Sequence, residues 1–140
     1  MPLQPGWVNR ILLIVLLGVT ASMMAGCANL RGGSASSAPL VIERVNLTAA
    51  GHFVDLRYRV TDAAAASSAF RPGAVFRLVD ERTGRAMAVP TTAKLGALRQ
   101  TRGLRAGHTY FMLFMNGGVR PGSLVTAEIA GFKFRHIAVQ

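Results

Sequence analysis

The chain of 140 residues is poor in cysteine, in carboxylates and in long apolar runs. Its only cysteine, Cys27, excludes an intramolecular disulfide, so the core must stabilise the fold without a covalent cross-link. Its six Asp and Glu residues form no paired motif of the kind that general acid–base catalysis uses. The sequence also lacks G-x-S-x-G, S-x-x-K and glycine-rich phosphate-loop patterns. We therefore expect no enzymatic activity and no cofactor, although separated residues could still converge on a non-local site.

The longest apolar run, residues 11–19, is shorter than the roughly 20 residues that a membrane-spanning helix needs. Arg10 precedes this run, and the small residues Ala25 and Gly26 follow it. This order of features is typical of a secretory signal peptide, which we place at residues 1–26. The alternative is an uncleaved anchor, because residues 21–26 extend the apolar stretch.

The residues Met24-Ala25-Gly26-Cys27 resemble the lipobox of bacterial lipoproteins, with Met24 where leucine is usual. The resemblance implies that Cys27 receives a diacylglyceryl group and that the signal is cut just before it. Residues 27–39 then form a flexible linker rich in Gly, Ser and Ala. We therefore expect an exported protein of the bacterial cell envelope that is anchored on the periplasmic side of a membrane by lipid and does not span it.

Basic residues greatly outnumber acidic ones, with 16 Lys and Arg against 6 Asp and Glu and a formal net charge of +10. Such a surplus predicts an anionic partner, either acidic lipid headgroups, an anionic envelope polymer or an acidic protein. Nucleic acid is not expected, because an exported protein would have to meet it outside the cytoplasm. The best candidate anion-binding residues lie in one loop-rich region without an intervening acid, namely Lys94, Arg99, Arg102 and Arg105. A solvated loop is the simpler alternative.

Residues 40–140 predict one all-β domain, an antiparallel sandwich of seven or eight strands. The clearest strand is 53–61, where apolar and polar side chains alternate. Residues 62–70 predict a short connector helix capped by Asp62, and Asp80-Glu81 is interpreted as a hairpin tip and not as an acid–base pair. The other expected strands are 41–48, 74–79, 85–89, 94–101, 109–115, 124–130 and 132–139.

Three turns share one composition, residues 70–73, 104–107 and 119–122, each ending in a glycine such as Gly107 or Gly122 that permits a positive φ. Residues 104–110, LRAGHTY, resemble the L-x-P-G-x-x-Y stretch of fibronectin type III and related immunoglobulin-like domains, with Ala106 in place of proline. This resemblance implies an immunoglobulin-like form of the antiparallel sandwich and a tyrosine corner, in which the Tyr110 hydroxyl bonds to nearby backbone. Residues 54–66 and 107–114 also resemble a group of bacterial envelope proteins for which no activity is implied.

Residues 107–116, GHTYFMLFMN, contain side chains suited to copper, and this raises the alternative of a metal-handling accessory protein. On a helix, His108, Met112 and Met115 would share one face, whereas on a strand the two methionines point to opposite faces. The glycines that bracket the segment and its aromatic residues favour a strand. We therefore expect no metal, and the alternative is a site built from His108 and Met112 with His52, His136 or Met87 from neighbouring strands.

Overall fold

The computed structural model describes residues 37–140. The chain divides into two units, and the described residues include the whole of the second, Ala38–Gln140. This unit begins two residues before the boundary expected at Leu40. Pro39 is buried, and its carbonyl accepts hydrogen bonds from the N–H groups of Thr61 at 2.9 Å and Asp62 at 3.2 Å. The signal peptide at 1–26, Cys27 and most of the linker at 27–39 lie outside the described residues.

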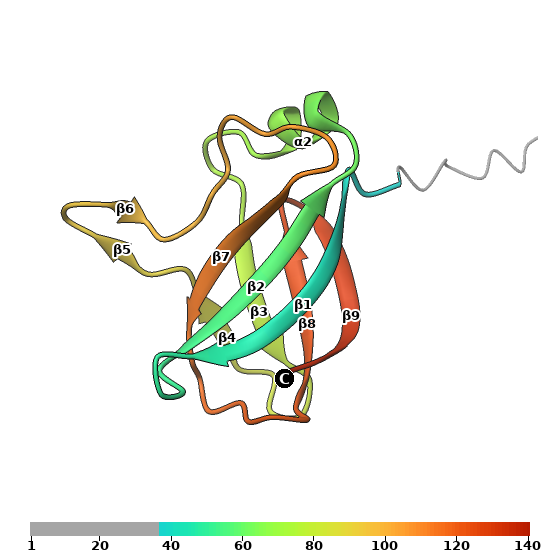
Figure 1. Ribbon diagram of the computed structural model, residues 1–140. Helices are drawn as coiled ribbons and strands as arrows, with labels where there is room; N and C mark the ends of the chain where they lie inside the picture. The colour runs from blue at the N-terminus through green and yellow to red at the C-terminus, as the bar shows by residue number, and fades with distance from the viewer. Residues whose placement is uncertain (1–36) are drawn as a thin grey trace, which may run out of the picture. The chain divides into compact units, whose positions relative to one another are not determined.

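The predicted antiparallel β-sandwich is confirmed, with seven strands in two main sheets. The first sheet has the order β1-β2-β7 and the second has the order β4-β3-β8-β9, while β5 and β6 form a separate hairpin that projects from the sandwich (Figure 1). The strands are β1 (Leu40–Thr48), β2 (Phe53–Val60), β3 (Phe76–Asp80), β4 (Ala86–Ala88), β5 (Thr91–Thr92), β6 (Gly96–Ala97), β7 (Thr109–Met115), β8 (Leu124–Ile129) and β9 (Phe132–Ala138).

Alternation along the strands builds the core between the two sheets. In β2, the apolar residues Val54, Leu56, Tyr58 and Val60 all have 0% exposure, while the intervening residues face outward. β7 follows the same period, because Met112 and Phe114 are fully buried and Met115 is 51% exposed. The second sheet contributes Leu78, Val125, Ala127 and Ile129 to the same core. The unit therefore has a complete core of its own, and its size is typical of domains that fold independently.

The connector between the two sheets is the helix α2 (Ala63–Ala69). The Asp62 side chain accepts a hydrogen bond of 3.0 Å from the N–H of Ala65, which is the predicted N-cap. Only Ala66 is buried in this helix, so it links β2 to β3 and adds little to the core.

The single strand predicted at 94–101 is wrong. Lys94 lies in the turn of the β5–β6 hairpin, β6 has only two residues, and residues 98–100 instead bond to the edge of β7. Two backbone hydrogen bonds show how the segment divides. The Leu98 N–H donates to the Pro90 carbonyl, just before β5, at 3.0 Å, and the Gln100 N–H donates to the Phe111 carbonyl of β7 at 2.9 Å. The other predicted strands agree with the structure to within two residues at each end.

Candidate functional site

The four predicted anion-binding residues lie on one connection, which we call the cationic segment and define as residues 94–105. It runs from the turn of the β5–β6 hairpin to the loop before β7. Lys94, Arg102 and Arg105 are exposed, and Arg99 is partly buried. The sequence contains no Asp or Glu from residue 82 to residue 127, so the positive charge is not offset by carboxylates of the segment or its sequence neighbours.

Residues 98–100 fix the middle of the cationic segment to the first sheet. Arg99 forms an isolated antiparallel bridge with Met112 of β7. Leu113 N–H donates to the Leu98 carbonyl at 2.9 Å, and the Gln100 side-chain oxygen accepts a weaker bond of 3.4 Å from Phe111 N–H. These bonds hold the backbone on either side of Arg99.

A cluster of aromatic rings contacts the cationic segment. Tyr58 contacts Phe70 with ring centroids 5.9 Å apart and Tyr110 at 5.8 Å, and Phe70 meets Phe76 edge-on at 5.2 Å. The buried Tyr58 hydroxyl donates a hydrogen bond to the Gln100 carbonyl, and burial, followed by the nearby Tyr110, raises the Tyr58 pKa far above its usual value. Sequence reasoning missed this contact, because 42 residues separate its two partners.

Arg99 completes this arrangement, because its guanidinium lies 4.3 Å from the centroid of the Phe76 ring. Arg99 and Arg102 also line one surface hollow of about 420 Å³, together with Leu95, Gly96, Ala97, Gln100 and Thr101. The structure therefore brings Arg99 and Arg102 together. Lys94 and Arg105 lie in the same segment and do not line the hollow.

All six carboxylates are engaged elsewhere in the domain. Among residues 37–140, the ion pairs of Asp and Glu are made with Arg57, Arg59, Arg77, Lys133 and His136, and none with the cationic segment. Asp62 caps α2, and Asp80 accepts bonds from Arg82 N–H at 3.1 Å and the Thr83 hydroxyl at 2.6 Å. The cations of the segment consequently remain available to an external anion.

The predicted contact between Tyr110 and nearby backbone is present. Its hydroxyl accepts a hydrogen bond of 2.8 Å from Arg105 N–H and lies 3.4 Å from the Gly103 carbonyl. Gly107 has a φ of +79° and Gly122 a φ of +88°, as the turn chemistry predicts. Tyr110 is the second residue of β7, the fifth strand of the two main sheets, whereas the tyrosine corner of immunoglobulin domains lies at the sixth strand. The membership of such a family therefore stays a prediction.

Replacing Tyr110 with phenylalanine tests what this contact contributes. We expect the free energy of unfolding to fall by about 1 kcal/mol, because the Arg105 N–H loses its acceptor. Denaturant unfolding of the variant and of the parent protein measures the difference. An unchanged midpoint would show that water replaces the hydroxyl at no cost.

The three histidines lie in different parts of the domain, and the structure does not gather them around Met112. His52 precedes β2, and its carbonyl accepts a hydrogen bond from the Asn116 N–H. The His108 carbonyl accepts a hydrogen bond from the Val60 N–H, at the opposite end of the β2–β7 pair. His136 belongs to the second sheet. His108 is exposed and Met112 has 0% exposure, so these two side chains do not form one accessible site. Within residues 37–140, no group of three or more His, Cys, Asp and Glu residues could hold a metal ion.

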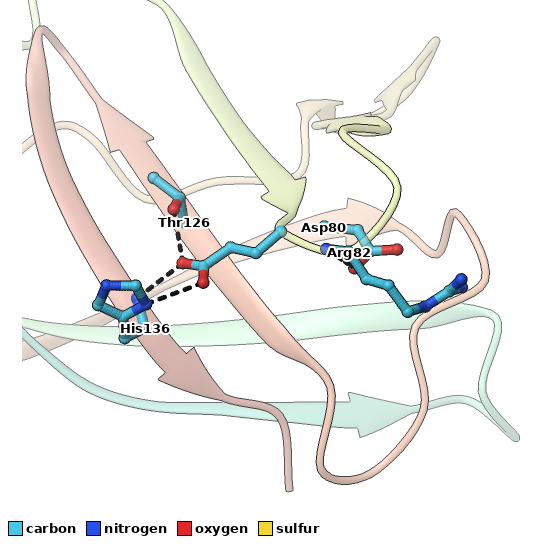
Figure 2. Close-up of polar contacts among 5 residues, drawn as sticks. Asp80, Arg82, Thr126 and His136 are labelled. Atoms are coloured by element: carbon cyan, nitrogen blue, oxygen red, sulfur yellow. Dashed lines mark hydrogen bonds and ion pairs between the residues drawn. The ribbon is translucent and has the colours of Figure 1, made fainter.

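A second polar cluster, which sequence reasoning missed, surrounds Glu81. Its carboxylate accepts bonds from the Thr126 hydroxyl at 2.8 Å and the His136 N–H at 2.8 Å, and it pairs with the His136 ring at 2.9 Å, as the dashed lines in Figure 2 show. The backbone bond from His136 is the largest cause of the lowered Glu81 pKa. His136 lies where the β8–β9 register shifts, and its φ of +57° is a backbone conformation that residues other than glycine rarely adopt.

The Glu81 cluster therefore stabilises an irregular part of the strand edge. The buried Asp80 ends β3 and Glu81 begins the turn that leads to β4, which confirms their interpretation as part of a hairpin tip. Both Glu81 oxygens are occupied by neighbouring groups, so this carboxylate is poorly placed to act as a general base.

Residues 37–140 contain no helix with the length and apolar character required to cross a bilayer. Comparison with known proteins adds no further assignment. The chain matches no protein-family model, no curated protein and no solved structure.

Proposed function

We propose that this protein is a lipid-anchored binding or structural module of a bacterial envelope that presents the cationic segment to an anionic partner. The observation that carries the proposal is that Arg99 and Arg102 line one hollow within a stretch, residues 82–127, that contains no Asp or Glu. The domain's carboxylates are engaged internally, while Lys94, Arg99, Arg102 and Arg105 have no carboxylate partner among the described residues.

The way in which the segment is held supports a binding role. Backbone bonds to β7, the Tyr58 hydroxyl and the Phe76 ring restrict the position of Arg99 before any partner arrives. A guanidinium that is already oriented loses less side-chain entropy when it binds a carboxylate or phosphate. A solvated surface loop needs none of these contacts, so the alternative interpretation of the segment as such a loop leaves them unexplained.

Anchoring through Cys27 supports the choice of location. The lipobox-like residues 24–27 lie about a dozen residues before the domain begins at Ala38. A flexible linker of that length has an end-to-end distance of roughly 20 Å. An anchored domain would therefore stay close to the membrane and to the anionic components of the envelope.

The test compares two charge variants of the same size. The first, Lys94→Gln/Arg102→Gln/Arg105→Gln, removes three exposed cations from the segment and leaves Arg99 on Phe76. The control, Arg44→Gln/Arg120→Gln/Arg135→Gln, removes three exposed cations from β1, the β7–β8 turn and β9, and none of these residues forms an ion pair among residues 37–140. The two variants have equal net charge.

We expect the segment variant to lose retention of envelope material by about tenfold or more, because each desolvated cation–anion contact contributes on the order of 1 kcal/mol. Retention of the parent protein on envelope fractions is measured at low and high salt, and salt should release the partner. Equal losses in the two variants would mean that net charge alone acts. Retention that resists salt and both variants would contradict the proposal.

A further inference from the structure

The β5–β6 hairpin ends in an apolar side chain next to a cation. Leu95 is 77% exposed, more than any other exposed large hydrophobic residue among residues 37–140. It follows Lys94 in the turn, and the hairpin extends away from both main sheets (Figure 1). Leu95 N–H donates to the Thr92 hydroxyl at 3.0 Å, and this bond closes the turn that carries Leu95.

A single exposed leucine needs no explanation by itself. Here the same residue lines the hollow that contains Arg99 and Arg102, so apolar and cationic groups converge on one feature. No carboxylate occurs in the sequence between residues 82 and 127 to weaken the positive potential around it. The tip therefore combines an apolar point with a basic surround.

These two properties together distinguish between classes of anionic partner. A soluble polyanion interacts with the cations and gains little from an exposed leucine. The interface of an anionic bilayer takes both, because phosphate groups attract Lys and Arg while the acyl region accepts an apolar side chain. Phosphate is also one of the two groups, with carboxylate, that the Arg99 and Arg102 guanidinium forks are suited to bind.

We propose that the hairpin tip inserts Leu95 into an anionic lipid bilayer, with Lys94, Arg99 and Arg102 placed on the lipid phosphates. This inference rests on the proposed cationic binding function and names its partner as a lipid surface. It gives the domain a second membrane contact beyond the lipid anchor, and the two contacts would fix the orientation of the domain on the membrane.

The test uses residues 38–140, the unit that contains the whole described core, with thermal unfolding as the check on folding. Vesicles of phosphatidylcholine alone and of phosphatidylcholine with phosphatidylglycerol are compared by sedimentation. Leu95→Ser should weaken binding to the anionic vesicles about tenfold, because the variant has no leucine side chain to transfer from water into the bilayer. Leu124→Ser removes an exposed leucine at the start of β8 and should leave binding unchanged.

A spectroscopic reporter follows the insertion itself. The only tryptophan of the chain is Trp7, so Leu95→Trp places a single tryptophan within residues 38–140. Its emission should shift to shorter wavelength with anionic vesicles, and brominated lipids should quench it. A soluble polyphosphate should produce neither effect.

The outcomes separate this inference from the proposed function. Binding that survives Leu95→Ser, or Leu95→Trp emission that does not shift, would overturn the insertion while leaving a salt-sensitive cationic surface intact. Equal binding to neutral vesicles would overturn the role of the cations at the tip. A parent protein that binds soluble polyphosphate and no vesicles would overturn the lipid as partner and support the proposed function alone.

Discussion

If Cys27 carries the proposed lipid anchor, replacing it with alanine should leave an unprocessed precursor in cells and abolish lipid modification. The chain has no other thiol that could take the diacylglyceryl group, so we expect complete loss and not a partial reduction. Two acyl chains hold a protein firmly on a bilayer, because each buried methylene contributes about 0.8 kcal/mol. Metabolic labelling with a fatty acid and the mobility of the product in a gel measure the change.

The control for this substitution is Ser34→Ala, which changes a small polar residue of the linker and should be processed normally. A Cys27→Ala product that is cut at the usual position and released as a soluble protein would contradict the lipoprotein assignment. An ordinary secretory signal would then account for residues 1–26.

Replacing Tyr58 with phenylalanine lowers the free energy of unfolding by about 1.5 kcal/mol. The Gln100 carbonyl loses a buried hydroxyl donor, while the ring can keep its packing against Phe70 and Tyr110. In a domain of this size, the expected fall in melting temperature is roughly 5–10 °C. Hydrogen exchange of residues 98–100 should also become faster, because the same hydroxyl helps to hold the cationic segment on β7.

The ionisation of Tyr58 also makes the free energy of unfolding depend on pH in the alkaline range. Burial raises the Tyr58 pKa in the folded domain, whereas an unfolded tyrosine ionises at about 10. Below pH 10 the tyrosine is protonated in both states, and its contribution to stability is constant. Above pH 10 the unfolded state loses the proton while the folded state keeps it, so stability falls as the pH rises.

The measurement uses a variant in which this ionisation can be followed alone. The chain has two tyrosines, so Tyr110→Phe leaves Tyr58 as the only one. Absorbance of the phenolate should appear together with the loss of the folded circular dichroism signal. Ionisation near pH 10 in a domain that remains folded would show that the hydroxyl is not buried as described.

The sandwich could be predicted from the sequence because its strongest signal is local. Alternation from Val54 to Val60 identifies a half-buried strand without knowledge of its neighbours, and Asp62 identifies the start of α2. The alternation expected along β7 also places Met112 and Met115 correctly on opposite faces of the sheet, because Met112 is buried and Met115 is half exposed. The copper alternative lost its main support by the same reasoning.

The support of the site could not be predicted, because it depends on contacts between distant residues. Tyr58 and Gln100, Arg99 and Phe76, and Glu81 and His136 are each far apart in the sequence, and only the tertiary structure brings them into contact. The strand predicted at 94–101 was wrong for a related reason. Its residues divide between a projecting hairpin and the edge of β7, and no local pattern records that division.

The most direct test of the cationic segment is crosslinking in living cells. A photoreactive amino acid replaces Gln100 or Thr101 beside the arginines, and a matched protein carries it at Ala138 on β9. We predict that the segment position captures an anionic envelope component, lipid included, and that the β9 position does not. Capture of the same material from both positions, or none from the segment, would contradict a cationic binding surface at residues 94–105.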